Sequence, residues 1–429
     1  MSAEGLHGEE MDLDVVVIGA GIMGSWAGLN LVNLSSHDSL RVAIIEQFPL
    51  PHARGSSHGQ SRIYRLAYPE RHQTVLARDS LQAWLQLQHA HPLDPIITRH
   101  DCIPSFLLID LQILPHTVIV TIDSECPLLR IADEASHGTI ERCLDSLAAS
   151  CPKGTYRALS KQDLLIEFPW IVHGHSDLRG LLDSNARILR ADKCIRYVQE
   201  EFQKNGGKIL DGMKITGVEM GDTVTVTGER EGESKEIRCR NLIVCTGAWS
   251  SNILSFLGIH HAPLQPMKMA VPYFKIKPGH TQSQVSMVME IQALGHFYST
   301  PQLEYPGLIK VAPDHGVAVD PDLRDMGDVS AEVERTSRFV AAHLPGLDPR
   351  PAIVETCMYT MTPDKMSILD RHPQWPNISF ATGFSGMGFK LSPYIGKVLA
   401  SWAMGQEVAY DLIPLQLNRF EQSHIASNF

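Results

Sequence analysis

The sequence predicts an α/β protein of two domains, one of which is assembled from segments far apart in the chain. Three observations point to this fold. Residues 14–46 read as a strand, a glycine-rich turn, a helix and a second strand. Further strand-to-glycine turns follow at 241–247 and 377–388, and the segment 265–318 between them contains short strand-like runs broken by Pro and Gly. We therefore expect a discontinuous first domain and a second domain with a mixed sheet inserted into it.

The first element is a βαβ unit with a dinucleotide-binding fingerprint. An apolar strand enters the turn Gly19-Ala-Gly21-Ile-Met-Gly24, a helix is expected over 22–32, and the second strand ends at Glu46. Gly19 permits the tight turn, Gly21 lets backbone amides approach a pyrophosphate, and Gly24 allows helix and strand to pack closely. The Glu46 carboxylate would bind ribose hydroxyls. This unit predicts dinucleotide binding but does not choose between FAD and a nicotinamide cofactor.

The later elements favour FAD. The strand at 241–247 and the one before Gly383 both enter small-residue turns, and a helix is expected over 394–403. Three such turns spread along the chain suggest one cofactor domain built from distant segments, which nicotinamide domains rarely need. Between them we expect an amphipathic helix at 193–204, strands over 208–226 broken at Gly221-Asp222, and a helix over 327–344.

Composition excludes several classes of protein. The chain has 429 residues with 37 Lys and Arg against 48 Asp and Glu, a formal charge of −11. Because it has no Lys/Arg-rich run, nucleic acid and anionic membranes are poor candidates for the main partner. The eight cysteines are scattered without a CxxC pair, so we expect reduced thiols and no metal site.

Three segments bear on targeting and membrane insertion. The stretch before Asp14 lacks the features of a signal peptide, and we expect residues 1–11 to be a frayed tail. The terminal Ser-Asn-Phe lacks the SKL-type peroxisomal tripeptide. The apolar window 103–122 contains Pro, Asp and His, so we expect buried strands there rather than a membrane span.

A polar loop after the βαβ unit could bind an anion. Residues 52–68 contain three arginines, two histidines and two tyrosines. Arg62 and Arg65 are three apart, the spacing of one helical turn, which would bring two guanidinium groups to one pocket. Arginine is suited to a bidentate grip on a carboxylate. A solvated surface loop is the alternative interpretation.

Three spaced motifs carry a family resemblance. They are Gly55-Ser-Ser-His-Gly-Gln-Ser-Arg-Ile-Tyr-Arg65, Cys357-Met-Tyr359-Thr-Met-Thr-Pro-Asp364 and Gly383-Phe-Ser-Gly-Met-Gly-Phe-Lys390. Together they resemble the monomeric sarcosine oxidase and L-pipecolate oxidase family of FAD-dependent amine oxidases. Glu304-Tyr-Pro-Gly-Leu-Ile-Lys310-Val-Ala is similar to its plant-like eukaryotic branch. The resemblance covers most of the chain, from about residue 14 to 419.

The resemblance implies a glutathione-reductase-type FAD-binding domain plus a mixed-sheet substrate domain. We expect the discontinuous FAD-binding domain to comprise 12–82, 183–263 and 356–429, and the substrate domain to comprise 83–182 and 264–355.

The resemblance also assigns roles to residues. From the residue alone we would interpret Cys357 as a buried core thiol, but the family motif implies a covalent bond from its sulfur to the flavin. Arg65 and Lys390 would bind the substrate carboxylate, and Lys310 and Arg62 would lie beside the flavin and promote its reaction with oxygen. The expected catalytic residues are Arg62, Arg65, Tyr298, Lys310, His315, Tyr359 and Lys390. The expected cofactor-binding residues are Gly19, Gly21, Gly24, Glu46, Ser57, His58, Cys357, Gly383, Gly386 and Gly388. Tyr359 and Tyr298 would line the substrate pocket, with core packing the alternative for Tyr298, whereas Trp249 and Met267 are interpreted as structural.

The sequence departs from the family pattern in three places. Met387 stands where the family has a histidine. His315 lies one residue after the position of a family active-site histidine, and it either takes that role through a shifted loop or is a surface histidine. The segment 102–130 does not align and is either an insertion in the substrate domain or a product of altered splicing.

The expected activity is oxidation of sarcosine, L-pipecolate or a similar secondary amino acid to an imine, which then hydrolyses, with oxygen as acceptor and hydrogen peroxide as product. We expect a monomer in the peroxisome or cytoplasm. Alternatives are a flavin dehydrogenase that uses an electron carrier, a degenerate FAD-binding protein without turnover, and a nicotinamide dehydrogenase.

Overall fold

A computed structural model describes residues 11–34, 40–98, 126–171, 177–280, 286–291 and 295–420. The predictions for the N-terminal tail up to residue 10, for the apolar window 103–122 and for the C-terminal tripeptide lie outside the described residues. Met11, placed in the tail by the sequence, begins the first strand instead.

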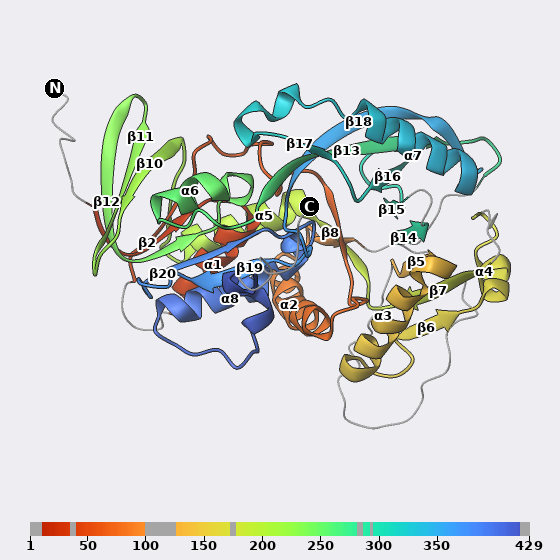
Figure 1. Ribbon diagram of the computed structural model, residues 1–429, viewed down its shortest axis with the longest axis horizontal. Helices are drawn as coiled ribbons and strands as arrows, with labels where there is room; N and C mark the ends of the chain where they lie inside the picture. The colour runs from red at the N-terminus through yellow and green to blue at the C-terminus, as the bar shows by residue number, and fades with distance from the viewer. Residues whose placement is uncertain are drawn as a thin grey trace.

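The first sheet has eight strands in the order β10-β11-β12-β1-β2-β9, with β20 paired to β12 and β19 to β20. Its strands are β1 (Met11–Ile18), β2 (Val42–Ile45), β9 (Lys208–Leu210), β10 (Met213–Glu219), β11 (Val224–Arg230), β12 (Glu233–Val244), β19 (Ile368–Arg371) and β20 (Ile378–Thr382). Three chain segments therefore build one sheet (Figure 1). This confirms the predicted discontinuous arrangement of the first sheet.

The parallel strands at the centre of this sheet carry apolar residues on both faces. Along β1, Val15 and Val17 belong to one core and Val16 and Ile18 to the core on the opposite face. A run that is apolar on both faces is typical of a parallel strand covered on both sides. The helices of this part are α1 (Ile22–Leu34), α5 (Ala191–Lys204), α6 (Ser250–Phe256) and α8 (Gly388–Ala403), together with the 3-10 turn η3 (Gly247–Trp249).

The second sheet is mixed and has nine strands in the order β17-β13-β16-β15-β14-β5-β7-β6, with β18 paired to β13. Its strands are β5 (Leu128–Asp133), β6 (Tyr156–Leu159), β7 (Leu178–Asp183), β13 (Gln265–Ile276), β14 (Ser286–Ile291), β15 (Gly295–Thr300), β16 (Leu308–Pro313), β17 (Val317–Ala318) and β18 (Leu347–Met361). The helices of this part are α3 (His137–Ser150), α4 (Lys161–Glu167) and α7 (Ser330–His343). Strand β14 runs parallel to β5 and antiparallel to β15, so the predicted mixed sheet is confirmed.

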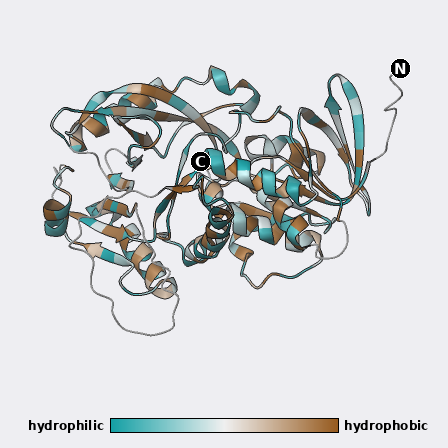
Figure 2. Cartoon of the chain, turned by 180° about the vertical axis from the view of Figure 1, so that it is seen from behind, coloured by the Kyte–Doolittle hydropathy of each residue, from teal (hydrophilic) through white to brown (hydrophobic). Residues whose placement is uncertain are grey.

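A small third sheet and a long helix join these two sheets. The sheet has the order β3-β8-β4, from β3 (Ser61–Tyr64), β8 (Arg187–Arg190) and β4 (Ile97–Thr98). Helix α2 (Arg71–Ala90) packs on α8, and the remaining 3-10 turns are η2 (Glu134–Ser136), η4 (Pro321–Met326), η5 (Ile413–Leu415) and η6 (Leu417–Phe420). Figure 2 shows brown and teal bands alternating along the helices, as expected where one helical face covers a core. Among the described helices, none is long and apolar enough to cross a bilayer.

Candidate active site

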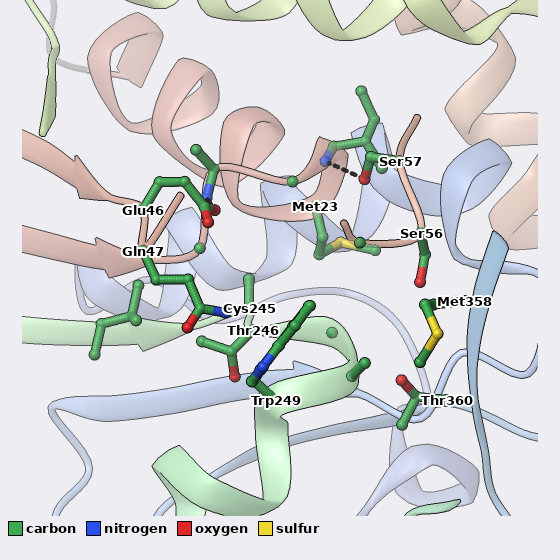
Figure 3. A pocket seen from close by; sticks show the side chains of 18 of the residues that line it. Met23, Glu46, Gln47, Ser56, Ser57, Cys245, Thr246, Trp249, Met358 and Thr360 are labelled. Carbon is green, nitrogen blue, oxygen red and sulfur yellow. Dashed lines mark hydrogen bonds between the residues drawn. The ribbon is translucent and has the colours of Figure 1, made fainter. Parts of the chain in front are cut away.

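The first turn of the βαβ unit opens a cavity of about 490 Å³ at the end of the eight-stranded sheet. Gly19 has φ of +104°, a conformation that favours glycine. A Cβ on Gly24 would lie 2.0 Å from the Gly19 carbonyl oxygen, so only glycine lets helix α1 approach the turn this closely. The Glu46 carboxylate accepts a hydrogen bond from Ala20 N at 2.9 Å, and this bond fixes the acidic residue against the turn (Figure 3).

Distant segments complete the walls of this first cavity. Ser57 Oγ accepts from Ile22 N at 2.9 Å and sits 3.1 Å from where a Gly21 Cβ would be. In Figure 3, Glu46 lies toward one end of the cavity and Thr360 toward the other. The buried Thr360 hydroxyl has no hydrogen-bond partner within the described chain.

These features fit an FAD. The helix N-terminus with its two close glycines suits a pyrophosphate, and the acidic residue at the end of β2 suits the adenosine ribose. The unpartnered Thr360 hydroxyl at the far end is a polar group left for a ligand. Trp249, interpreted from the sequence as structural, also lines this cavity, where its Nε1 donates to Asp322 Oδ1 at 2.7 Å.

A second cavity of about 780 Å³ adjoins the first. Residues that line both cavities include His58, Arg62, Tyr359, Gly386 and Phe389. One wall of the second cavity is a single face of the nine-stranded sheet, because alternate side chains of a strand point to the same side. Successive strands contribute Cys357 and Tyr359 from β18, Tyr273 from β13, Lys310 from β16, Tyr298 and Thr300 from β15, Glu290 from β14 and Arg130 from β5.

The two arginines of the polar loop both reach the second cavity, but not by the predicted helical spacing. Arg62 lies within strand β3 and Arg65 just past its end, where the chain leaves the sheet. The expectation of a helical turn was wrong, because Ser61–Tyr64 pairs with β8. Three backbone carbonyls hold the Arg62 guanidinium, those of Ser56, Ser61 and His58, at 2.6–2.9 Å.

Arg65 and Lys390 line the second cavity without a carboxylate partner among the described residues. The Arg65 guanidinium carbon lies 5.0 Å from the Tyr68 ring centroid, and its Nε is buried without a hydrogen-bond partner in the described part of the chain. Within the described part of the chain, Lys390 Nζ donates to the Gly386 carbonyl alone, at 3.4 Å. Burial, together with the neighbouring Arg65 and Arg62, lowers the pKa of Lys390 to about 7.

Lys310 differs from these two cations because it has a buried counter-ion. Its Nζ lies 2.6 Å from Glu304 Oε1, with side chains only 6% and 3% exposed. Ser61 Oγ donates to the same carboxylate oxygen at 2.5 Å and contacts Lys310 Nζ. Burial lowers the pKa of Lys310, and the Glu304 carboxylate opposes this effect. Sequence reasoning used Glu304 only as part of a motif and missed its pairing with the lysine.

Two tyrosines and a cysteine line the same cavity. Burial raises the pKa of both Tyr298 and Tyr359, so their hydroxyls stay protonated and can donate hydrogen bonds. Cys357 is a free, half-buried thiol on β18. Burial raises its pKa, and Arg62 and Lys310 oppose the rise. His58 lies against β18, where its Nε2 is within hydrogen-bonding distance, 3.1 Å, of the Thr356 carbonyl oxygen.

The C-terminal glycine motif borders the junction of the cavities. Gly383 and Gly386 have φ of +63° and +84°. A Cβ on Gly386 would lie 2.7 Å from the Tyr359 ring, and Gly388 begins helix α8. The predicted helix therefore starts six residues earlier than expected, and it carries Lys390 in its first turn. Met387 lines the second cavity in place of the family's histidine.

His315 was wrongly placed in the site. Its side chain is 60% exposed, lies 3.9 Å from Glu332 and does not line either cavity. The preceding residue, Asp314, does line the second cavity, and His296 Nδ1 lies 3.3 Å from its carboxylate. The pair follows from sheet register, because Asp314 N donates to the His296 carbonyl across β15 and β16. Sequence reasoning missed His296 because nothing in the sequence shows which residue faces Asp314 across the sheet.

Arg130 and Glu290 were also missed. They pair on adjacent parallel strands, Arg130 Nη2 with Glu290 Oε1, on the wall of the second cavity. The unaligned segment 102–130 was expected to be either an insertion or a splicing product. Residues 102–125 lie outside the described chain, whereas 128–130 form part of strand β5 in the sheet.

A dinucleotide cavity that adjoins a chamber lined by cationic side chains is typical of nucleotide-dependent oxidoreductases. The chain belongs to the FAD dependent oxidoreductase family, whose family model matches residues 14–402. It is therefore an FAD-dependent enzyme.

Known proteins agree with this assignment. The chain is 35% identical to human peroxisomal sarcosine oxidase over 95% of its length and 96% of the relative's. It is 28% identical to monomeric sarcosine oxidase from Arthrobacter sp. over 95% of this chain and 96% of that one. The structure of L-proline dehydrogenase from P. horikoshii superposes with a TM-score of 0.74 at 16% identity, covering 97% of this chain and 99% of the other, which shows the shared fold.

Proposed function

We propose that the protein is an FAD-dependent oxidase of secondary amino acids such as sarcosine or L-pipecolate, giving an imine and hydrogen peroxide, with the imine then hydrolysing. The observation that carries this proposal is the pair Arg65 and Lys390. Both line a chamber next to the dinucleotide cavity, and within the described residues neither forms an ion pair. Two such cations suit one carboxylate. The relatives named sarcosine oxidase support the same substrate class.

The chain's own groups would bind and orient the substrate. Arg65 and Lys390 hold the α-carboxylate, which fixes the position of the amine and its adjacent C–H toward the junction of the two cavities. The Tyr298 and Tyr359 hydroxyls line the same space and can donate hydrogen bonds. When bound, FAD supplies the two-electron oxidation of the C–N bond and the transfer of these electrons to oxygen.

The residues that would hold the FAD fall into two sets. Gly19, Gly21, Gly24 and Glu46 form the expected site for the pyrophosphate and ribose, with Ser57 beside the turn. His58, Gly386 and Gly388 border the end of the cavity that adjoins the second chamber. We further propose that Cys357 bonds covalently to the flavin through its sulfur, as the resemblance implies.

Arg62 and Lys310 would supply positive charge near the flavin. Arg62 lines both cavities, and its guanidinium is fixed by backbone carbonyls. A fixed cation stabilises negative charge as it develops on oxygen without reorganisation during the reaction. Lys310 lines the second cavity and holds its position through Glu304 and Ser61.

The same Lys310–Glu304 pair favours a second candidate. An ion pair carries no net charge, so it stabilises an oxygen-derived anion less than a lone lysine does. A flavin dehydrogenase that passes electrons to a carrier would accord with this pairing. The yield of hydrogen peroxide per substrate oxidised in air separates the two, since an oxidase gives one equivalent and a dehydrogenase gives little.

We propose a monomer, because the Arthrobacter relative is named monomeric, and a location in the peroxisome or cytoplasm, because the human relative is named peroxisomal.

The visible spectrum of the purified protein tests the proposed function. Sarcosine and then L-pipecolate are added under nitrogen, and loss of the flavin absorbance by either compound is expected. Lys390→Met should need a far higher substrate concentration for the same bleaching. A yellow protein that neither compound bleaches would contradict the proposed substrate class, and a colourless protein would contradict the proposed reaction.

A further inference from the structure

The second cavity contains a buried cation that the proposed reaction does not use. The Arg130 side chain is 3% exposed. Its Nη2 contacts Glu290, but Nε and Nη1 are buried without a hydrogen-bond partner in the described ranges. Leaving donors of a charged group unpaired in the interior is costly, so an arginine in this state is suited to an incoming acceptor.

Sheet register directs Arg130 into the cavity. It lies opposite Val288 of β14 and Leu181 of β7, and the alternate position on β14 is Glu290. Arg130 lines only the second cavity, whereas Arg62 and Tyr359 also line the dinucleotide cavity. Arg130 therefore belongs to the part of the chamber beyond the junction with the cofactor cavity.

Arg130 stands close to the expected carboxylate site without being part of it. The Arg65 guanidinium lies 5.0 Å from the Tyr68 ring centroid, and Tyr68 and Arg130 line the same chamber. Arg65 has no carboxylate partner among the described residues. Arg130 is paired with Glu290, but only through Nη2. The chamber thus offers two separate sets of donors to one ligand.

The cavity is larger than the simplest substrate requires. Sarcosine has six non-hydrogen atoms, which take up roughly 180 Å³ at the volume of liquid water per atom. The chamber measures about 780 Å³. The flavin proposed to bond to Cys357, which lines the same chamber, takes part of this volume, and the remainder is the space open to a longer side chain beside a carboxylate held at Arg65 and Lys390.

We propose that Arg130 binds a second acidic group, the side-chain carboxylate of an N-substituted dicarboxylic amino acid, and so selects this class of substrate. This inference rests on the proposed function for the oxidation itself. Glu290 holds the guanidinium through Nη2, and the two free nitrogens donate to the ligand. His296, 3.8 Å from Glu290 Oε1, lies beside the same group.

Matched pairs of acid and amide test the proposal. Anaerobic flavin reduction is measured with N-methyl-L-glutamate against N-methyl-L-glutamine, and with N-methyl-L-aspartate against N-methyl-L-asparagine, with sarcosine as reference. We expect the acid of at least one pair to be preferred tenfold or more in the second-order rate of reduction. Arg130→Met should abolish this preference and leave reduction by sarcosine within about threefold.

Two further variants test whether loss of the preference comes from Arg130 itself rather than from damage to the fold. Arg130→Met combined with Glu290→Gln avoids a buried unpaired carboxylate and should likewise lose the preference. Arg179→Met changes a 49% exposed arginine on the neighbouring strand β7 and should keep it. Equal rates for acid and amide in the unmodified protein, or a preference that survives in both Arg130 variants, would overturn the proposal.

A binding measurement separates this inference from the proposed function. The oxidised protein is titrated with glutarate and with butyrate, which cannot be oxidised at nitrogen, and the flavin absorbance is followed. Glutarate should bind at least tenfold more tightly, and Arg130→Met should remove the difference. If no amine bleaches the flavin but glutarate retains its Arg130-dependent advantage, the proposed function fails and the second anion site stands. Equal affinities would refute the second site whatever the activity.

Discussion

Lys310 and Glu304 form an ion pair buried in the wall of the substrate chamber, with Nζ 2.6 Å from Oε1. Ser61 donates to the same carboxylate oxygen and also contacts Lys310 Nζ, so the three side chains form one hydrogen-bonded cluster. Burial alone would favour the neutral lysine, and the carboxylate opposes it. Glu304 is therefore the residue whose charge opposes the loss of a proton from Lys310.

The first prediction concerns this pair. Glu304→Gln removes the negative charge that raises the pKa of Lys310, so the lysine will lose its proton at lower pH. If protonated Lys310 promotes reaction with oxygen, the midpoint of the pH profile for flavin reoxidation should fall by about one to three units. Stopped-flow mixing of the reduced enzyme with oxygenated buffer measures this profile. Glu355→Gln removes a carboxylate that accepts from Tyr273 and Tyr305 rather than from a lysine, and it should leave the midpoint in place.

The role of Lys310 itself follows from the same reasoning. Lys310→Met should slow flavin reoxidation far more than flavin reduction, because the substrate is held by other residues. The two half-reactions are measured separately in the stopped-flow instrument. Equal slowing of both would remove the assignment to the oxygen step.

A second prediction tests the grip on the substrate carboxylate. Arg65→Met removes a charged donor whose hydrogen bond contributes about 1.5–3 kcal/mol, so KM for sarcosine should rise roughly 10- to 150-fold. Steady-state peroxide production measures it. The exposed Arg179→Met serves as the matched control and should keep the original KM. An unchanged KM in Arg65→Met would show that the carboxylate binds elsewhere.

A third prediction concerns pH. Lys390 has a pKa of about 7, lowered by burial and by Arg65 and Arg62, and a bound carboxylate requires its protonated form. Below pH 7 the free enzyme already carries the charge, whereas above it binding must take up a proton. The dissociation constant of butyrate, which has no amine to titrate, should therefore rise up to tenfold per pH unit above 7. Flavin absorbance titration measures it, and Lys390→Met should bind weakly with no such dependence.

A fourth prediction tests the proposed covalent link. Acid precipitation should leave the yellow colour in the pellet of the unmodified protein, because a thioether to the flavin survives denaturation. Cys357→Ser should release the colour into the supernatant. Cys143→Ser changes another free thiol, which is buried and lines neither cavity, and should retain the colour in the pellet. Release from the unmodified protein would show that the cofactor is held without a covalent bond.

The sequence predicted the fold well where the signal is local or repeated. The βαβ unit, helix α5 and the break between β10 and β11 follow from apolar periodicity and glycine positions close together in the chain. The early start of α8 was missed because its first residues, Gly388 to Lys390, belong to the glycine motif that we interpreted as a turn.

The candidate site was predicted where a family motif carried it, and missed where only sheet register defines it. Arg65, Lys310, Tyr359 and Lys390 all line the second cavity. By contrast, the pairing of Arg130 with Glu290 joins residues 160 positions apart on adjacent strands. Strand order cannot be deduced from periodicity, which fixes only the face on which each side chain lies.

The last prediction compares alanine substitutions at Gly24, in the dinucleotide turn, and at Gly138, in helix α3. Gly24→Ala places a methyl group 2.0 Å from the Gly19 carbonyl oxygen, so helix α1 must move away from the dinucleotide turn. This overpacking should lower the free energy of unfolding by about 1–3 kcal/mol and weaken FAD retention. Gly138→Ala, in helix α3, meets nothing within 4 Å and should raise stability by about 0.5–1 kcal/mol. Urea unfolding of the flavin-loaded proteins, with the absorbance ratio of flavin to protein, measures both effects. A Gly24→Ala protein as stable and as yellow as the unmodified one would show that the turn does not need this close approach.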